Sequence, residues 1–270
     1  MRILHVVPSF LPAVRYGGTI TSVHGLCRGL AGLGHDVHVF TTNVDGPADS
    51  PVPTDTPVAL DGVTVRYFPS PRLRRLFWSP RLGLALRDAV TSFDVVHTHS
   101  IFLWPTWAAS RAARRCRVPC VVSPRGMLEK ELVRRRSRWV KTAWLALIER
   151  RNLEGAAAIH FTSERERREA RRFGYRLRGE AVIPNGADLP QPHEGARGEI
   201  SPAISRALAD PRPYYLFLGR ISWKKGLDRL LRALALVPDA RLVVAGNDDE
   251  GYWPQMERMI GELGIADRVR

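Results

Sequence analysis

The chain has 270 residues, 44% of them hydrophobic, and a net charge of +14 with a sequence pI near 10.7. This size and hydrophobic content exclude an intrinsically disordered chain and favour one large domain with part of another. No apolar run approaches the roughly 18 to 20 residues of a membrane-spanning helix, and the segment after Met1 is too short and strand-like for a signal peptide. We therefore expect a cytoplasmic protein. The three cysteines form no CxxC pair and predict no disulfide framework.

The positive charge predicts an acidic partner. Three kinds are considered: nucleic acid, an anionic membrane surface and a phosphate-rich substrate. No helix-turn-helix, RNP or zinc-finger pattern accompanies the charge, so no nucleic acid is expected. Residues Leu128 to Leu153 place apolar side chains, including two tryptophans, at helical spacing among arginines. Two interpretations stay open: a packed helix with a solvated basic back, or a helix that holds a cytoplasmic protein at the inner face of an anionic membrane.

Apolar runs that alternate with amphipathic patterns predict an open, mostly parallel α/β sheet. A stretch rich in Pro and Asp, 45–61, predicts a mobile loop, and Ser163 is expected to cap a helix. Polar residues 191–211 predict a linker between a complete domain, 1–190, and a partial domain, 212–270. The expected strands are 3–7, 37–41, 63–68, 95–97, 119–122, 157–161, 181–183, 214–218 and 241–245. The expected helices are 19–33, 82–91, 104–116, 128–153, 164–173, 227–236 and 253–263.

The sequence GRISWKKG, from Gly219 to Gly226, is the strongest candidate for a binding motif. It follows the apolar run 214–218, which we interpret as a buried strand, and precedes a helical pattern. Parallel sheets bind nucleotides at such strand-to-helix loops. Arg220 offers a planar fork to phosphate oxygens, Lys225 adds a point charge, and Gly226 allows close backbone approach at the helix start. The alternative is a solvated basic loop.

Two glycines and two histidines follow the early strands. Gly17 and Gly18 precede the helix expected at 19–33, where backbone amides suit a phosphate; the alternative is an ordinary tight turn. Zinc at His97 and His99 lacks an apparent third or fourth ligand, so no metal site is expected. Because alternate residues of a strand face opposite ways, we expect one histidine to be packed and the other, His99, to face the cleft.

Three further positions follow predicted strands. Arg125 comes after strand 119–122, and an arginine there cannot accept a proton but can bind a phosphate or orient a hydroxyl group. Asn185 and Gly186 lie at the junction of the two predicted domains, where a turn explains them. Gly246 ends strand 241–245.

The ordered set of these segments resembles the retaining glycosyltransferases of family 4, which have the GT-B fold. The resemblance implies a complete N-terminal Rossmann-like domain on the acceptor side and a partial C-terminal Rossmann-like domain that binds the nucleotide sugar, without the family's Glu-x7-Glu segment. It also implies transfer of a sugar with retention, without a cofactor or a required metal. The matching segments are 3–7, 8–18, DVVHTH at 94–99, SPRGML at 123–128, 162–164, IPNGAD at 183–188, GRISWKKG and LVVAG at 242–246.

The resemblance also implies roles for the candidate residues. Arg220 and Lys225 would stabilise the departing diphosphate, and Gly17, Gly18 and Gly246 would line the donor site. His99 and Arg125 would position the sugar or the acceptor, although many family members carry histidine where this chain has Arg125. Asn185 and Gly186 would face the cleft.

Two functions follow from these expectations. The first is an enzyme that uses a UDP- or GDP-sugar donor and a glycan or lipid-linked acceptor. The second is a catalytically inactive, truncated remnant that binds a membrane or a partner through Leu128 to Leu153.

Overall fold

A computed structural model describes the chain except residues 136–137, 188–204, 206–208, 210–212 and 249–250. Contacts within the chain divide it into two compact units, Met1–Leu189 and Pro190–Arg270. The predicted linker, 191–211, lies almost entirely outside the described residues. No helix of the described residues is both long and apolar enough to cross a bilayer.

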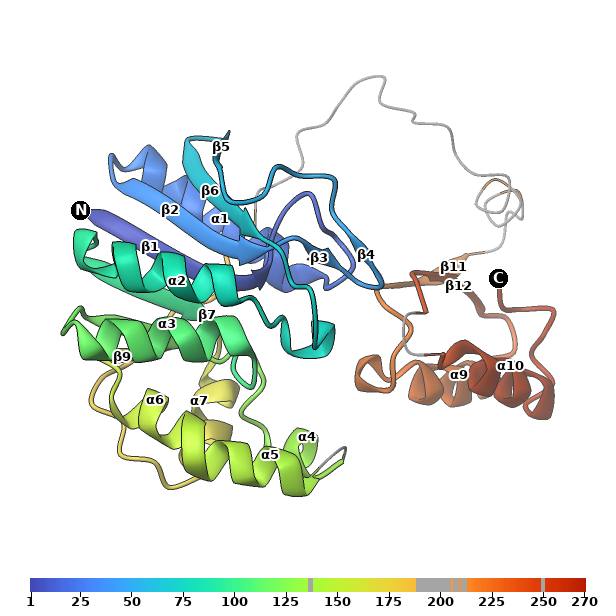
Figure 1. The fold of residues 1–270 in the computed structure, drawn as a ribbon. Helices are drawn as coiled ribbons and strands as arrows, with labels where there is room; N and C mark the ends of the chain where they lie inside the picture. The colour runs from blue at the N-terminus through green and yellow to red at the C-terminus, as the bar shows by residue number, and fades with distance from the viewer. Residues whose placement is uncertain (136–137, 188–204, 206–208, 210–212, 249–250) are drawn as a thin grey trace. The chain divides into compact units, whose positions relative to one another are not determined.

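The described part of the first unit contains an eight-stranded sheet in the order β10-β9-β8-β7-β1-β2-β6-β5 (Figure 1). Every neighbouring pair is parallel except β5 and β6, as the α/β pattern predicts. The strands are β1 (Arg2–Ser9), β2 (Asp36–Thr42), β5 (Pro57–Leu60), β6 (Val63–Phe68), β7 (Val95–His99), β8 (Cys120–Ser123), β9 (Ala158–Phe161) and β10 (Glu180–Val182).

The stretch 45–61 was wrongly predicted as a loop without regular structure. β5 pairs antiparallel with β6 through the two-residue turn Asp61–Gly62, whose φ angles are 47° and 79°. An Asp-Gly pair with two positive φ angles is the preferred hairpin turn, so the sequence carried the signal. Upstream, β3 (Val44–Asp45) and β4 (Ala48–Asp49) form a short antiparallel pair.

Helices cover both faces of the sheet. α1 (Gly18–Gly32) packs against β2 and β6, whereas α2 (Pro80–Ala89) and α3 (Trp104–Arg115) pack on the other face. Gly34, at φ 84°, ends α1: its N–H donates to Ala31 and that of His35 to Leu30, which satisfies two terminal carbonyls. Short 3₁₀ turns lie at η1 (Arg74–Leu76) and η2 (Val90–Ser92).

The described residues of the segment 128–153 do not form a single α-helix, because a π-helical turn separates two of its α-helical parts. The segment contains α4 (Lys130–Arg135), α5 (Arg138–Trp144), a π-helical turn η3 (Leu145–Glu149) and α6 (Arg150–Glu154). One side packs into the core, because Leu128, Leu145 and Leu153 are buried. The following helix, α7 (Glu164–Arg171), begins at Ser163, whose Oγ accepts from the N–H of Glu166 at 3.1 Å, so the predicted cap is confirmed.

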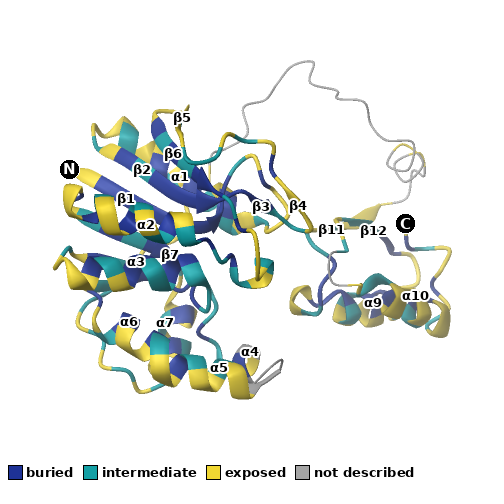
Figure 2. Ribbon diagram, viewed as in Figure 1, coloured by how far each residue is buried: buried dark blue, intermediate teal, exposed yellow. Residues whose placement is uncertain are grey.

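The second unit pairs β11 (Tyr214–Leu218) with β12 (Arg241–Ala245) in parallel, beside η4 (Trp223–Lys225), α9 (Leu227–Ala235) and α10 (Trp253–Glu262). Its core joins β12 to the apolar faces of both helices. The expectation that 214–218 is buried is wrong for the described structure, since Leu218 is 78% exposed and most of β11 faces solvent (Figure 2).

Candidate functional site

The candidate residues of the first unit gather where parallel strands end. β1 lies between β2 and β7, and from these two neighbours the chain builds the sheet outward in opposite directions. Such a switch in strand order leaves a crevice at the carboxyl ends of the strands, which is where open α/β sheets bind ligands. Gly17 follows β1, Arg125 follows β8 and Asn185 follows β10, so all three belong to this edge.

The two glycines of the first loop have different structural reasons. Gly17 precedes α1 with φ 76°, a conformation that residues with a side chain rarely adopt. A Cβ added to Gly18 would meet nothing within 4 Å, so its lack of a side chain leaves the helix start open. The predicted position of both at a helix N-terminus is correct, and their contact with a donor phosphate stays a prediction.

Arg125, His99 and Asn185 are in direct contact although they are far apart in the sequence. Arg125 donates through Nη2 to His99 Nδ1 at 3.1 Å and through Nη1 to Asn185 Oδ1. Behind them, His99 Nε2 lies 2.9 Å from Nδ1 of the buried His5. His5 was not among the candidates from the sequence. A histidine inside the apolar strand Ile3–Val7 does, however, indicate a buried side chain that needs a hydrogen-bond partner.

The expectation that His97 and His99 face opposite ways is wrong. Residues two apart in a strand share a face, and the two rings lie 4.2 Å apart between centroids. His99 is fully buried and therefore does not face an open cleft. His5 pairs with His97 in the parallel register, and His160 lies next to His97, so four imidazoles line one face of the sheet. Gly186 follows Asn185 in an exposed stretch without regular secondary structure.

Burial holds these imidazoles neutral. It lowers the pKa of His5 from 6.5 to about 3, and the nearby Arg125 charge lowers it further in the same direction. Burial, followed by the neighbouring histidines and Arg125, also lowers the pKa of His97 and His99 well below the usual value. The imidazoles therefore carry no charge near neutral pH, and the Arg125 guanidinium is the cation beside them.

Hydrogen bonding fixes the tautomers of this group. A guanidinium only donates, so His99 Nδ1 must accept and His99 must carry its proton on Nε2. That proton is donated to His5 Nδ1, which leaves the proton of His5 on Nε2, an atom that has no partner among the described residues.

The structure supplies a third imidazole for the metal site that the sequence left incomplete. His5, His97 and His99 place ligand atoms within 4.8 Å of one another, the one such group found among the described residues. A metal ion needs the lone pair of each ligand nitrogen. His99 Nε2 has none to offer while Arg125 donates to Nδ1, and the guanidinium charge beside it repels a cation. This arrangement disfavours a metal.

Two buried glutamates hold the loops after β7 and β8 in place through hydrogen bonds to backbone N–H groups. Neither was a candidate from the sequence. Glu166 accepts from Gly126 N at 2.6 Å and from Thr162 N at 2.7 Å, which ties the loop after β8 to the start of α7. Glu149 accepts from Phe102 N at 2.8 Å and anchors the loop after β7. Burial raises the pKa of Glu149.

In the second unit, the GRISWKKG loop lies beside the end of β12. Gly219 N donates to Ala245 O and Ile221 N to Asn247 O, each at 2.9 Å. A Cβ at Gly246 would lie 1.8 Å from Gly219 O, so Gly246 is required by the close approach of two backbones. Gly246 therefore lies next to the basic motif, and its place in a donor site stays a prediction.

The cations of this loop are available to an anion. Lys225 is exposed and Arg220 is partly exposed, and no carboxylate of the described residues pairs with either. Gly226 begins α9 at φ 71°. Nearby, Asp248 accepts from Tyr252 N and Trp253 N at 2.7 and 2.8 Å, so it satisfies two backbone donors at the start of α10 from outside the helix.

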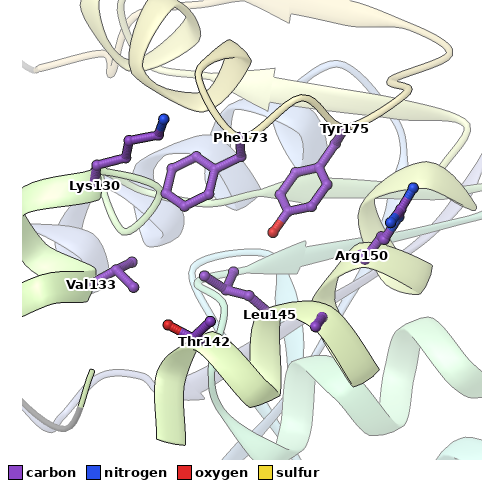
Figure 3. A pocket seen from close by; sticks show the side chains of 8 residues that line it. Lys130, Val133, Thr142, Leu145, Arg150, Phe173 and Tyr175 are labelled. Carbon is purple, nitrogen blue, oxygen red and sulfur yellow. The ribbon is translucent and has the colours of Figure 1, made fainter. Parts of the chain in front are cut away.

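A separate open pocket of about 330 Å³ lies between the segment 128–153 and the stretch that carries Phe173 and Tyr175 (Figure 3). Its apolar floor includes Leu145 and Phe173, and Phe173 stacks on Tyr175 with centroids 5.8 Å apart. It contains none of the candidate residues. The lining consists of Lys130, Val133, Thr142, Leu145, Ala146, Arg150, Phe173 and Tyr175.

Solved structures share this architecture. Sucrose-phosphate synthase from Thermosynechococcus elongatus superposes with a TM-score of 0.70 at 19% identity, over all of this chain and 70% of that one. HepE of Anabaena in complex with UDP and glucose gives a TM-score of 0.65 at 17% identity, over all of this chain and 68% of that one. The fold is therefore GT-B.

Family models give the same answer from the sequence. The glycosyl transferase 4-like domain matches residues 17–186, and the glycosyl transferases group 1 domain matches 203–270. The chain therefore belongs to the group 1 glycosyltransferases with a glycosyl transferase 4-like domain. The D-inositol 3-phosphate glycosyltransferase of Xylanimonas cellulosilytica is 29% identical over 94% of this chain and 64% of that protein. The alpha-D-kanosaminyltransferase of Streptomyces kanamyceticus is 31% identical over 45% of this chain and 32% of that protein. The chain thus spans less than two thirds of the length of these relatives.

Proposed function

We propose that the protein is a retaining glycosyltransferase that uses a UDP- or GDP-sugar donor and a glycan or lipid-linked acceptor, without a metal or a cofactor. The observation that carries this proposal is the basic loop of the second unit, where Arg220 and Lys225 lack a carboxylate partner in the described residues and the backbones of Gly219 and Gly246 meet. Similar structures support the donor class, because HepE is complexed with UDP and with UDP-glucose.

In this proposal the protein stabilises the departing nucleoside diphosphate. Arg220 and Lys225 offset its growing negative charge, which is the usual way that an enzyme lowers the barrier of such a step. The diphosphate takes the proton of the attacking acceptor hydroxyl on the same face of the sugar, so no pair of catalytic carboxylates is needed. Arg125 positions the sugar or the acceptor, and the buried His99 holds its guanidinium from behind. Gly17 and Gly18 leave room for the acceptor to approach.

A calorimetric titration of the full chain with UDP and then GDP tests the donor site. We expect one nucleotide to bind and Arg220→Ala to weaken that binding by roughly tenfold or more, because a charge-assisted hydrogen bond contributes about 1.5–3 kcal/mol. Arg87→Ala is the matched control, since Arg87 is an exposed arginine of the first unit. If folded protein binds neither nucleotide, or if Arg220→Ala binds as well as the parent chain, the proposed donor site is wrong.

We also propose that the protein is cytoplasmic and that its segment 128–153 contacts the anionic surface of the inner membrane. Its outward side exposes Trp139 by 75% and Leu147 by 72%, while its inner side packs into the core. Exposed apolar groups beside basic residues suit an interface of lipid headgroups and acyl chains. This proposal would bring a lipid-linked acceptor to the protein.

Vesicle sedimentation tests the membrane contact. We expect the full chain to bind vesicles that contain phosphatidylglycerol, and the pair Trp139→Ser and Leu147→Ser to lower the bound fraction by about tenfold, because each loses apolar area that would enter the lipid. Leu33→Ser is the control, since Leu33 is 76% exposed at the end of α1. Equal losses in the control and the pair would argue against a specific surface.

A further inference from the structure

Arg125 is a partly buried cation that forms no direct ion pair with a carboxylate of the described residues. Its two hydrogen-bond partners, His99 and Asn185, are both neutral. The nearby carboxylate of Glu166 is already occupied by Gly126 N and by the backbone and hydroxyl of Thr162. Burial lowers the pKa of Arg125 and the Glu166 charge offsets only part of that effect. A guanidinium removed from water without a directly paired carboxylate is unfavourable, and an anionic ligand would relieve this cost.

The same contacts hold the guanidinium in one orientation. The acceptors at Nη1 and Nη2 fix its plane, and its Nε–H is buried without a partner in the described residues. The Arg125 backbone has φ 54°, a left-handed conformation that is uncommon without glycine and is found at functional sites. A planar fork with unused donors matches the oxygens of a phosphate or a carboxylate.

His5 supports this arrangement from behind. Its Nδ1 accepts a hydrogen bond from the Nε2–H of His99, so His99 must present its Nδ1 lone pair to Arg125. Without an acceptor at the position of His5 Nδ1, the Nε2–H of His99 is left unpaired in the core. The other tautomer would then direct an N–H at the guanidinium and break the contact.

We propose that Arg125 binds an oxyanion, a phosphate or carboxylate carried by the acceptor, and that His5 is a positioning residue that acts through His99. The proposal rests on the proposed function, which takes the first unit as the acceptor side. The oxyanion is assigned to the acceptor because Arg220 and Lys225 already supply a cation for each phosphate of a nucleotide-sugar donor.

Nuclear magnetic resonance of the full chain, titrated with inorganic phosphate at constant ionic strength, tests the site. We expect phosphate to shift the Arg125 Nε–H signal and the ring nitrogens of His99. Arg125→Gln should weaken phosphate binding by at least about tenfold. His5→Leu should weaken it and change the His99 tautomer, whereas His5→Asn, which keeps an acceptor near the position of Nδ1, should restore both. Arg87→Gln, at an exposed arginine, should have no effect.

Calorimetry with UDP separates the two sources of the oxyanion. Unchanged UDP affinity in Arg125→Gln supports the acceptor, whereas an equal loss of UDP and phosphate binding assigns Arg125 to the donor and overturns this proposal. A lack of phosphate shifts at Arg125 also overturns it, and a normal His99 tautomer in His5→Leu refutes the role of His5. Asn185→Ala removes the second hydrogen-bond acceptor that orients the Arg125 guanidinium, and Asn185 is exposed. Phosphate binding at Arg125 can therefore be tested with this variant even if the His5 variants do not fold. Failure of the donor site would be recognised separately, through Arg220→Ala.

Discussion

The Gly246→Ala variant is expected to lose the contact between the two loops of the second unit and, with it, nucleotide binding. The added methyl group would lie 1.8 Å from Gly219 O and 2.6 Å from Gly219 C, and both are backbone atoms. The hydrogen bonds from Gly219 N and Ile221 N hold these loops together, so relief of the clash must break them. We expect a loss of about 3 kcal/mol or more in the stability of this unit.

Urea unfolding and a UDP titration measure this effect, and hydrogen exchange of 214–245 locates it. Gly261→Ala is the matched control in the same unit, because a Cβ there meets nothing within 4 Å and the residue lies in α10. The control should stabilise the unit by about 0.5–1 kcal/mol, since alanine loses less backbone entropy in a helix. Wild-type stability and UDP affinity in Gly246→Ala would show that the loops do not need this contact.

The first unit is expected to lose stability as the pH falls below about 6.5. The pKa of His5 drops from 6.5 in the unfolded chain to about 3 in the fold, so the unfolded state binds more protons throughout that interval. The contribution of the neutral His5 is complete above pH 6.5 and is lost as the pH falls towards 3. From His5 alone the loss at pH 5 is about 2 kcal/mol. The lowered pKa values of His97, His99 and His160 act in the same direction.

Urea unfolding from pH 7.5 to 5 measures this dependence. His5→Asn keeps an acceptor for His99 but removes one titrating group, so its stability should fall by about 2 kcal/mol less over the same range. The comparison of slopes, rather than of absolute stabilities, isolates the titration of His5 from the packing cost of the substitution. An identical slope in both proteins would mean that His5 does not titrate on unfolding.

Local features of the fold were predictable because they depend on neighbouring residues. Apolar periodicity located the strands and helices of both units, Ser163 was identified as a cap, and the strand-to-helix position of GRISWKKG was correct. The hairpin at Asp61–Gly62 was also encoded locally and was overlooked. Two features were not predictable in this way: the π-helical turn within 128–153 and the exposure of β11. Periodicity shows which face of an element is apolar, but it does not show what covers that face.

The sequence by itself determined the fold class, the family and the strand ends at which candidate residues lie. Only the tertiary structure decided which of them meet: His5 and His99 are 94 residues apart, and Arg125 and Asn185 are 60 apart. The register of parallel strands brings them together, and no local sequence pattern states which residues of distant strands become partners. Burial then fixes the charge of the group, because the removal of water keeps the imidazoles neutral and leaves Arg125 as the cation.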